Sequence, residues 1–259
     1  VSFPPENLIT LVAPGFFGDY TFHPYWGRWY FWETCAFIGV SGLALACYGM
    51  LSAGVTAKRA LLITLAVAVV LAFGDNSPLF TILYDWVPFF DKFRGSAKFI
   101  FFVTLILCIF SGYGMDRILR ERMAAPRALA VAAAAAVVLI LGGSVVSLMD
   151  GKPAMKAMYA TGQTYLSAAT YTNPTFAAAS RSFAGLGLLL AGVTLAMGTV
   201  FALWMRRKPH AAFVLGALAI TEVFVFARMQ RPTFDASNSV IPQLREYFAA
   251  RPGDYRTLN

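Results

Sequence analysis

Long runs of apolar residues dominate this chain and predict helices that cross a membrane. A helix rises about 1.5 Å per residue, so about 20 residues span a hydrocarbon core about 30 Å thick. Six stretches approach or reach that length: 34–53, 60–75, 97–115, 128–149, 183–205 and 211–228. The pattern therefore predicts an all-α polytopic membrane protein, with six transmembrane helices in a domain that covers residues 34–228.

Composition and the placement of possible metal ligands narrow the class further. The chain is 58% hydrophobic and 13% charged, with a mean hydropathy of +0.63, unlike a soluble domain. Cys35, Cys47 and Cys108 lie within or at the edges of predicted spans, as small apolar side chains do. His23 and His210 fall on opposite sides of the membrane in this topology. We therefore predict neither a disulfide framework nor a His/Cys metal site.

Basic residues cluster in the three short loops on one side. The loops 54–59, 116–127 and 206–210 hold nine of the 21 Lys and Arg residues: Lys58, Arg59, Arg117, Arg120, Arg122, Arg127, Arg206, Arg207 and Lys208. Short basic loops face the cytoplasm, so both chain ends and the segments 76–96 and 150–182 are expected outside. Anionic lipid headgroups account for the net charge of +8. Because basic residues occur on both faces, the sequence argues against a nucleic-acid partner.

The two ends of the sequence have the character of internal loops. The first residue is Val1, and no charged region followed by a short apolar run predicts a signal peptide. Residues 251–259 are typical of a turn that leads into a strand. We therefore expect an internal piece of a longer protein, in which 229–259 begins an extracytoplasmic domain.

The segment 1–33 is dense in aromatic residues and predicts a structure at the membrane interface. Its prolines prevent one long helix, although 6–13 could form a short one. An aromatic belt that anchors the protein at the headgroups is the favoured interpretation of its Trp and Tyr residues. Carboxylates at this depth are costly unless they are paired or functional. Glu6, Asp19 and Glu33 are therefore candidate functional groups.

The segment 75–98 predicts an interfacial or re-entrant helix followed by an anion site. Its apolar residues recur at helical spacing, but the run is too short to cross a bilayer. Ser96 is the expected N-cap of the next span, which puts Arg94 before that helix and Lys98 in its first turn. Two cations beside free backbone N–H groups favour an anion such as phosphate. The alternative is that both side chains extend to the headgroups or pair with nearby aspartates.

Glu222 is an acidic residue deep within the predicted span 211–228. An ionisable group at such depth faces the interior of the bundle or a wet cavity. We expect Glu222 to face a cavity toward the outer side of the membrane. A structural pair with a basic or hydroxyl group is the alternative.

Several short motifs, taken in order, resemble the YfhO-like bacterial membrane proteins. They are Pro5-Glu6-Asn7-Leu8, Pro14-Gly15-Phe16-Phe17-Gly18-Asp19, Tyr25-Trp26-Gly27, Phe93-Arg94-x-x-x-Lys98-Phe99, and Gly112-Tyr-Gly-Met-Asp116 at the end of a span. The likeness extends over most of 1–259. Ser96 departs from the pattern, since such proteins often have Pro between the Arg and the following basic residue.

The resemblance implies a GT-C glycosyltransferase, which takes sugar from a polyprenyl-phosphate donor outside the cytoplasm. It implies a bacterial inner-membrane location, a glycan or other envelope polymer as acceptor, and a donor phosphate near Arg94 and Lys98. The key acid of this class usually lies in the first extracytoplasmic loop, which we expect this chain to lack. Asp19, Glu6 and Glu33 are then secondary acidic groups near the acceptor or a divalent metal.

Two other functions are alternatives. A flippase or transporter for lipid-linked sugars would need charges deep in several spans and broken helices in matched repeats, and the sequence offers only Glu222 and no repeat. A non-catalytic scaffold for envelope assembly would tolerate the loss of Arg94 and Lys98. It would be sensitive instead to changes on the aromatic surface of 1–33.

Overall fold

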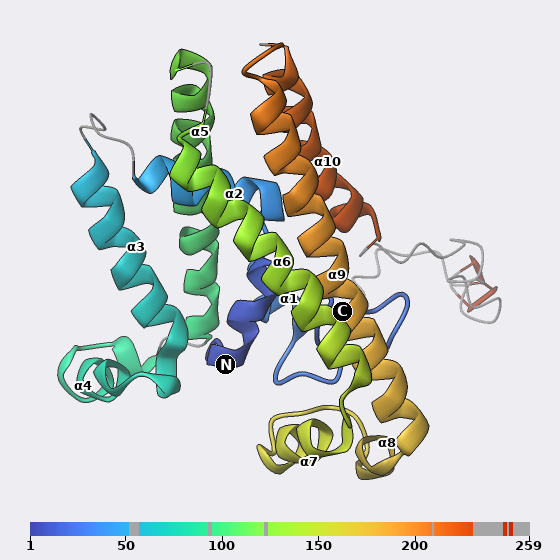
Figure 1. Ribbon diagram of the computed structural model, residues 1–259. Helices are drawn as coiled ribbons and strands as arrows, with labels where there is room; N and C mark the ends of the chain where they lie inside the picture. The colour runs from blue at the N-terminus through green and yellow to red at the C-terminus, as the bar shows by residue number, and fades with distance from the viewer. Residues whose placement is uncertain are drawn as a thin grey trace.

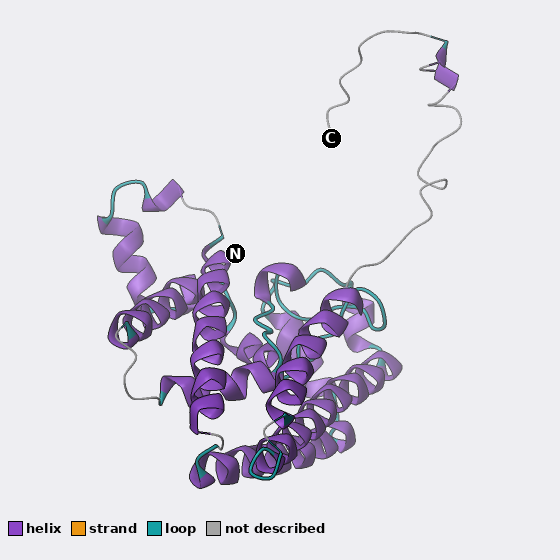
Figure 2. Cartoon of the chain, turned by 90° about the horizontal axis from the view of Figure 1, so that it is seen from above, coloured by secondary structure: helices purple, strands orange, loops and turns teal. Residues whose placement is uncertain are grey.

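The fold of this protein is all-helical (Figures 1 and 2). The computed structural model describes residues 1–51, 57–92, 95–121, 124–208, 210–229, 246–247 and 249–250. Within these residues the elements are η1 (Pro5–Leu11), α1 (Phe31–Thr34), α2 (Val40–Met50), α3 (Lys58–Phe73), η2 (Gly74–Asn76), α4 (Pro78–Trp86), η3 (Phe90–Lys92), η4 (Ser96–Phe99), α5 (Ile100–Glu121), α6 (Pro126–Leu148), α7 (Lys152–Ala160), α8 (Ala168–Thr172), α9 (Pro174–Trp204) and α10 (Ala211–Met229). The described part of the chain contains no strand, which confirms the predicted all-α class.

Five of the described helical segments are long and apolar enough to cross a membrane. They are Lys58–Asn76, Ser96–Glu121, Pro126–Leu148, Pro174–Trp204 and Ala211–Met229. Each corresponds to one of the last five predicted stretches. The chain is therefore a multi-pass membrane protein.

The first predicted span, 34–53, is not one continuous helix, so the predicted count of six transmembrane helices is not confirmed. The chain leaves α1 at Thr34, and α2 begins at Val40 and contains 11 residues, a length of about 17 Å. Gly39 separates the two helices with a φ of +83°, a left-handed conformation that a continuing helix excludes. The run around Gly39 is apolar throughout, so hydrophobicity alone did not reveal the break.

The helix ends that carry the basic loops lie together at one end of the bundle. In Figure 1 the starts of α3, α6 and α10 and the ends of α5 and α9 are at the top, whereas α4 and α7 are at the bottom. Successive long helices therefore alternate in direction, as the loop charges predict. The short helix η1 (Pro5–Leu11) overlaps the predicted 6–13 but begins and ends earlier, and α4 forms the short helix expected within 75–98.

Glycines allow two pairs of helices to pack closely. A methyl group added at Gly114 of α5 would overlap the carbonyl oxygen of Leu45 on α2. One added at Gly185 of α9 would lie 2.6 Å from the carbonyl oxygen of Gly143 on α6. Small residues bring helix backbones together inside a bilayer, where no hydrophobic force drives association.

The first residues of the chain lie between the end of α3 and η4, the short helix that leads into α5. The Phe3 N–H donates to the carbonyl of Ala72 at 2.8 Å, and the Ala97 N–H donates to the carbonyl of Val1 at 3.1 Å. Gly95, rather than Ser96, is the N-cap of η4. The Ser96 hydroxyl donates instead to the Val1 carbonyl at 3.3 Å, because the first residues of the chain occupy the position beside it.

Candidate functional site

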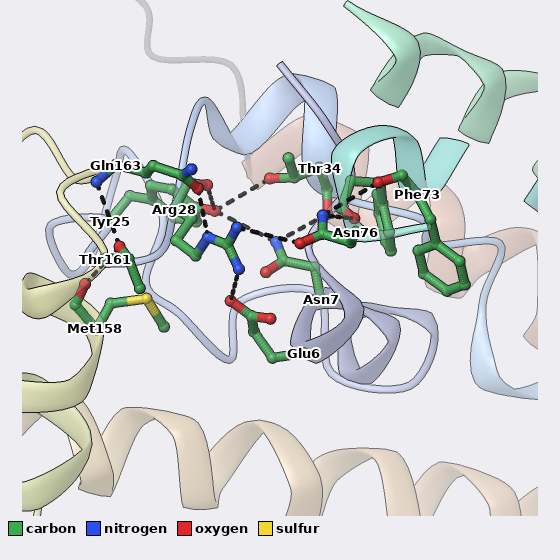
Figure 3. Close-up of polar contacts among 11 residues, drawn as sticks. Glu6, Asn7, Tyr25, Arg28, Thr34, Phe73, Asn76, Met158, Thr161 and Gln163 are labelled. Carbon is green, nitrogen blue, oxygen red and sulfur yellow. Dashed lines mark hydrogen bonds and ion pairs between the residues drawn. The ribbon is translucent and has the colours of Figure 1, made fainter. Parts of the chain in front are cut away.

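Arg28 connects the N-terminal segment to two distant parts of the chain (Figure 3). Its guanidinium forms an ion pair with Glu6 at 3.2 Å and donates to the side-chain oxygen of Gln163 at 2.7 Å. A longer hydrogen bond of 3.5 Å reaches Asn76, in η2 directly after α3. The predicted candidate Glu6 is thus paired, and its clearest role is to hold these segments together.

Tyr25, Asn7 and Thr34 extend the same network around Arg28 (Figure 3). The Tyr25 hydroxyl donates to the Arg28 carbonyl at 2.9 Å, and the Asn7 amide donates to the Thr34 carbonyl at 3.1 Å. Burial raises the pKa of Tyr25 to about 12, although bonds with Thr34 and Asn7 oppose the shift. Tyr25 therefore stays protonated and remains a hydrogen-bond donor.

Asp19 forms the centre of a tight turn. Its Oδ1 atom accepts hydrogen bonds from three backbone N–H groups, those of Thr21 (2.8 Å), Phe22 (2.6 Å) and His23 (3.2 Å). Only 3% of the residue is exposed. Within the described residues no hydrogen bond reaches the other carboxylate oxygen, Oδ2. Asp19 thus stabilises the turn through Oδ1, while its Oδ2 remains available to accept a hydrogen bond.

His23 makes a contact that the sequence analysis missed. Its Nε2 lies 2.7 Å from the hydroxyl of Ser180 on α9, and its ring stacks on Phe176 with centroids 5.0 Å apart. Burial lowers the pKa of His23, and the negative charge of Asp19 partly opposes that effect. Ser180 is fully buried, so the pair fastens the turn to α9 rather than forming an exposed nucleophile.

Glu33 and Glu222 are in contrasting environments. Glu33 lies in α1, and its Oε2 is buried without a hydrogen-bond partner among the described residues. Glu222 lies in α10, and its two carboxylate oxygens accept from the backbone N–H groups of Val40 (3.1 Å) and Ser41 (2.9 Å). Glu222 therefore caps the N-terminus of α2, where unpaired N–H groups and the helix dipole favour a negative charge.

An apolar groove of about 600 Å³ lies between α9, α10 and the N-terminal segment. We call it the α9–α10 groove. Leu186 and Leu190 line it from α9, and both are at least half exposed on the outside of the bundle. Its ionisable lining residues are Glu222 and Asp19. The predicted position of Glu222 beside a cavity is consistent with this geometry.

A second cavity, the aromatic cleft, encloses about 530 Å³ between the segment 19–32 and residues 165–166. Tyr20, Tyr30, Trp32 and Tyr165 provide half of its eight aromatic and imidazole rings. Asp19 and Phe22 line both this cleft and the α9–α10 groove. An apolar cavity and a polar aromatic one therefore meet at these two residues.

The predicted anion site remains a prediction. Arg94 lies outside the described residues, and Lys98 is exposed in η4. Lys98 lines neither the groove nor the cleft. The backbone N–H groups of Ala97 and Lys98 donate to the carbonyls of Val1 and Gly95, so two amides at this helix start are already used.

No cluster of three His, Cys, Asp or Glu side chains suited to a metal ion occurs in the described part of the chain. In comparisons with protein-family models, curated proteins and solved structures, nothing matches this chain.

Proposed function

We propose that this chain forms the membrane core of a GT-C-type glycosyltransferase. It would transfer a sugar from a polyprenyl-phosphate donor to an acceptor in the bacterial cell envelope. The observation that carries the proposal is the meeting of the α9–α10 groove and the aromatic cleft at Asp19 and Phe22. An enzyme of this kind must hold a lipid chain and a sugar side by side.

The α9–α10 groove has the chemistry of a lipid-chain site. Its lining is almost entirely aliphatic and aromatic, and it opens on the outer surface of the bundle at Leu186 and Leu190. A polyprenyl chain could enter it laterally from the bilayer. Pockets of roughly 300–1,000 Å³ commonly hold small molecules, so this groove can accommodate part of such a chain.

In this proposal the sugar lies on the extracytoplasmic side. The basic helix ends lie at the top of Figure 1, and short basic loops favour the cytoplasm. Asp19 and Phe22 reach the groove near Met229, at the opposite end of α10. The donor headgroup would therefore emerge outside the cytoplasm.

Individual residues receive distinct roles in this proposal. Asp19 lies where the two cavities meet, and its Oδ2 can accept a hydrogen bond from a sugar hydroxyl. Arg94 and Lys98 remain the proposed cations for the donor phosphate, since a positive group stabilises a leaving phosphate. Glu6 and Glu222 have structural partners, which makes them poor choices for proton transfer.

The proposal is tested with the protein in nanodiscs and a polyprenyl-phosphate hexose carrying a labelled sugar. Leu190→Trp fills the groove, whereas Val200→Trp places the same bulk elsewhere on α9; the native residues are 58% and 59% exposed. Leu190→Trp should weaken donor binding at least about tenfold, a change of about 1.4 kcal/mol. Val200→Trp should bind as the wild type does.

The same nanodisc assay distinguishes the contribution of the groove to donor binding from that of the anion site. Arg94→Ala/Lys98→Ala should also weaken binding at least tenfold if each cation contributes about 1.5–3 kcal/mol. Donor binding that neither Leu190→Trp nor the double variant changes would refute the proposed lipid site. If the donor binds but its labelled sugar is never transferred to a glycan acceptor, the transferase assignment is refuted.

One structural observation favours a flippase as a second candidate. The break between α1 and α2 leaves a helix N-terminus capped by a carboxylate from another helix. Discontinuous helices are typical of transporters, where their ends form binding sites. A flippase would move a labelled lipid-linked sugar across a liposome membrane with the sugar still attached, which a transferase does not require.

A further inference from the structure

The aromatic cleft contains a stacked array of rings from separate segments. Tyr30 stacks on Trp32 on one side and on Tyr165 on the other, with centroids 4.8 Å apart in both pairs. Tyr20 adds a contact with Trp32 at 5.7 Å. The exposed fractions run from 36% for Tyr30 to 63% for Trp32, so much of the ring surface faces the cavity and its opening.

Backbone and side-chain contacts hold this array in place. The Trp29 N–H donates to the Gln163 carbonyl at 2.9 Å, and Arg28 donates to the Gln163 side chain at 2.7 Å. These bonds dock the loop that carries Tyr165. Trp29 has a φ of +57°, a left-handed conformation that is uncommon outside glycine. A non-glycine residue keeps such a conformation only when its surroundings impose it.

The chemistry of the cleft selects against an anionic or purely apolar occupant. Its described lining residues include no Lys or Arg, and Asp19 contributes a carboxylate, so phosphate and other anions are disfavoured. Several tyrosines add hydroxyl groups to the lining, which an acyl chain would not use. A sugar ring fits both features, because its C–H face packs on an aromatic ring while its hydroxyls bond to polar groups.

A membrane anchor alone does not explain this arrangement. Aromatic belts place separate rings around the protein at headgroup depth. Here Tyr20, Tyr30, Trp32 and Tyr165 contact one another around a cavity of about 530 Å³. Trp86, which is 82% exposed on α4, is a better example of an anchoring residue.

We propose that the aromatic cleft binds one or two uncharged sugar rings of the acceptor glycan. The assignment of this sugar as an acceptor rests on the proposed transferase function. Binding of a free sugar is a property of the cleft itself and can be measured without any transfer reaction.

The test measures the binding of neutral disaccharides to the full chain in nanodiscs by saturation-transfer NMR. The probes are maltose, cellobiose and di-N-acetylchitobiose. At least one should bind, and Trp32→Ala and Tyr165→Ala should each weaken that binding about two- to twelvefold, since an aromatic contact contributes about 0.5–1.5 kcal/mol. Trp86→Ala should leave it unchanged. Trp32→Phe and Tyr165→Phe, which keep a ring, should retain most of the affinity.

Two results would overturn the inference: no probe binds, or Trp32→Ala and Tyr165→Ala bind as the wild type does while their unfolding temperatures are unchanged. A parallel titration with polyprenyl phosphate lacking sugar separates this inference from the proposed function. Lipid binding without disaccharide binding refutes the cleft assignment alone. Disaccharide binding without lipid binding supports the cleft and refutes the transferase lipid site.

Discussion

The carboxylate of Glu222 on α10 accepts a hydrogen bond of 2.9 Å from the backbone N–H of Ser41 on α2. A second bond, of 3.1 Å, comes from Val40. These contacts satisfy N–H groups at the start of α2 that the break at Gly39 leaves without partners in the helix, and an unpaired backbone group is costly. The residue that the sequence marks as a cavity candidate therefore stabilises a discontinuous helix.

Replacing Glu222 should destabilise the fold. Glu222→Ala removes two charge-assisted bonds, each worth about 1.5–3 kcal/mol, and leaves two N–H groups unpaired. Glu222→Gln should lose less, because its amide oxygen still accepts. Thermal unfolding in detergent measures both. Phe224→Ala, at a residue that is 74% exposed on the same helix, is the control. A Glu222→Ala variant as stable as Phe224→Ala would show that the cap contributes nothing.

The close approach of α2 and α5 predicts opposite effects for two glycines of α5. Gly114→Ala places a methyl group against the Leu45 carbonyl and should destabilise the protein by about 1–3 kcal/mol. At Gly112 an added methyl group meets nothing within 4 Å. Gly112→Ala should be neutral or stabilising by up to about 1 kcal/mol, since alanine favours helix. Equal unfolding temperatures for the two variants would contradict this packing.

Loss of Arg28 should release the loop around Gln163. Arg28→Ala removes the bonds to Gln163 and Glu6, and hydrogen exchange of residues 161–167 should accelerate about tenfold, as for a loss of about 1.4 kcal/mol. Arg120→Ala is the matched control, because Arg120 forms an ion pair with Asp116 while 78% exposed. Exposed pairs contribute little. Unchanged exchange in Arg28→Ala would rule out a docking role.

The environment of His23 predicts a pH dependence of stability. Because burial lowers the pKa of His23 in the folded protein, the unfolded chain binds a proton at a higher pH than the folded one does. The stability contributed by neutral His23 is therefore present above about pH 6.5 and falls as the pH drops through that value toward the lowered folded pKa. Unfolding temperatures measured from pH 8 to pH 5 should decline less for His23→Gln than for the wild type. Parallel declines would contradict the prediction.

The sequence predicts the long helices because their signal is local. Twenty consecutive apolar residues can satisfy their backbone only as a helix in a bilayer, so five of the six stretches appear as expected. The break at Gly39 is different, because the residue that caps the helix after it, Glu222, lies 182 residues from Val40. No local pattern distinguishes that glycine from those that pack inside continuous helices.

The candidate site was only partly predictable for the same reason. Glu6, Asp19 and Glu33 stand out as carboxylates among aromatic residues, but the sequence does not show which of their neighbourhoods are tied to distant segments. Glu6 pairs with Arg28, and the turn around Asp19 is fastened through His23 to Ser180, which lies 157 residues further along the chain. The array of aromatic rings likewise forms only when the segment that carries Tyr165 meets the N-terminal segment. The sequence does not show this contact, and it therefore favours a membrane anchor as the role of the N-terminal aromatic residues.

The most direct test of the proposed function is photo-crosslinking with a polyprenyl phosphate that carries a diazirine in its chain. The protein is irradiated in nanodiscs, and the modified peptides are identified by mass spectrometry. We expect labelling concentrated in residues 186–194 of α9 and 218–226 of α10, and its loss in Leu190→Trp but not in Val200→Trp. Labelling spread evenly over the exposed faces of α3, α6 and α9, with no change in Leu190→Trp, would contradict this expectation.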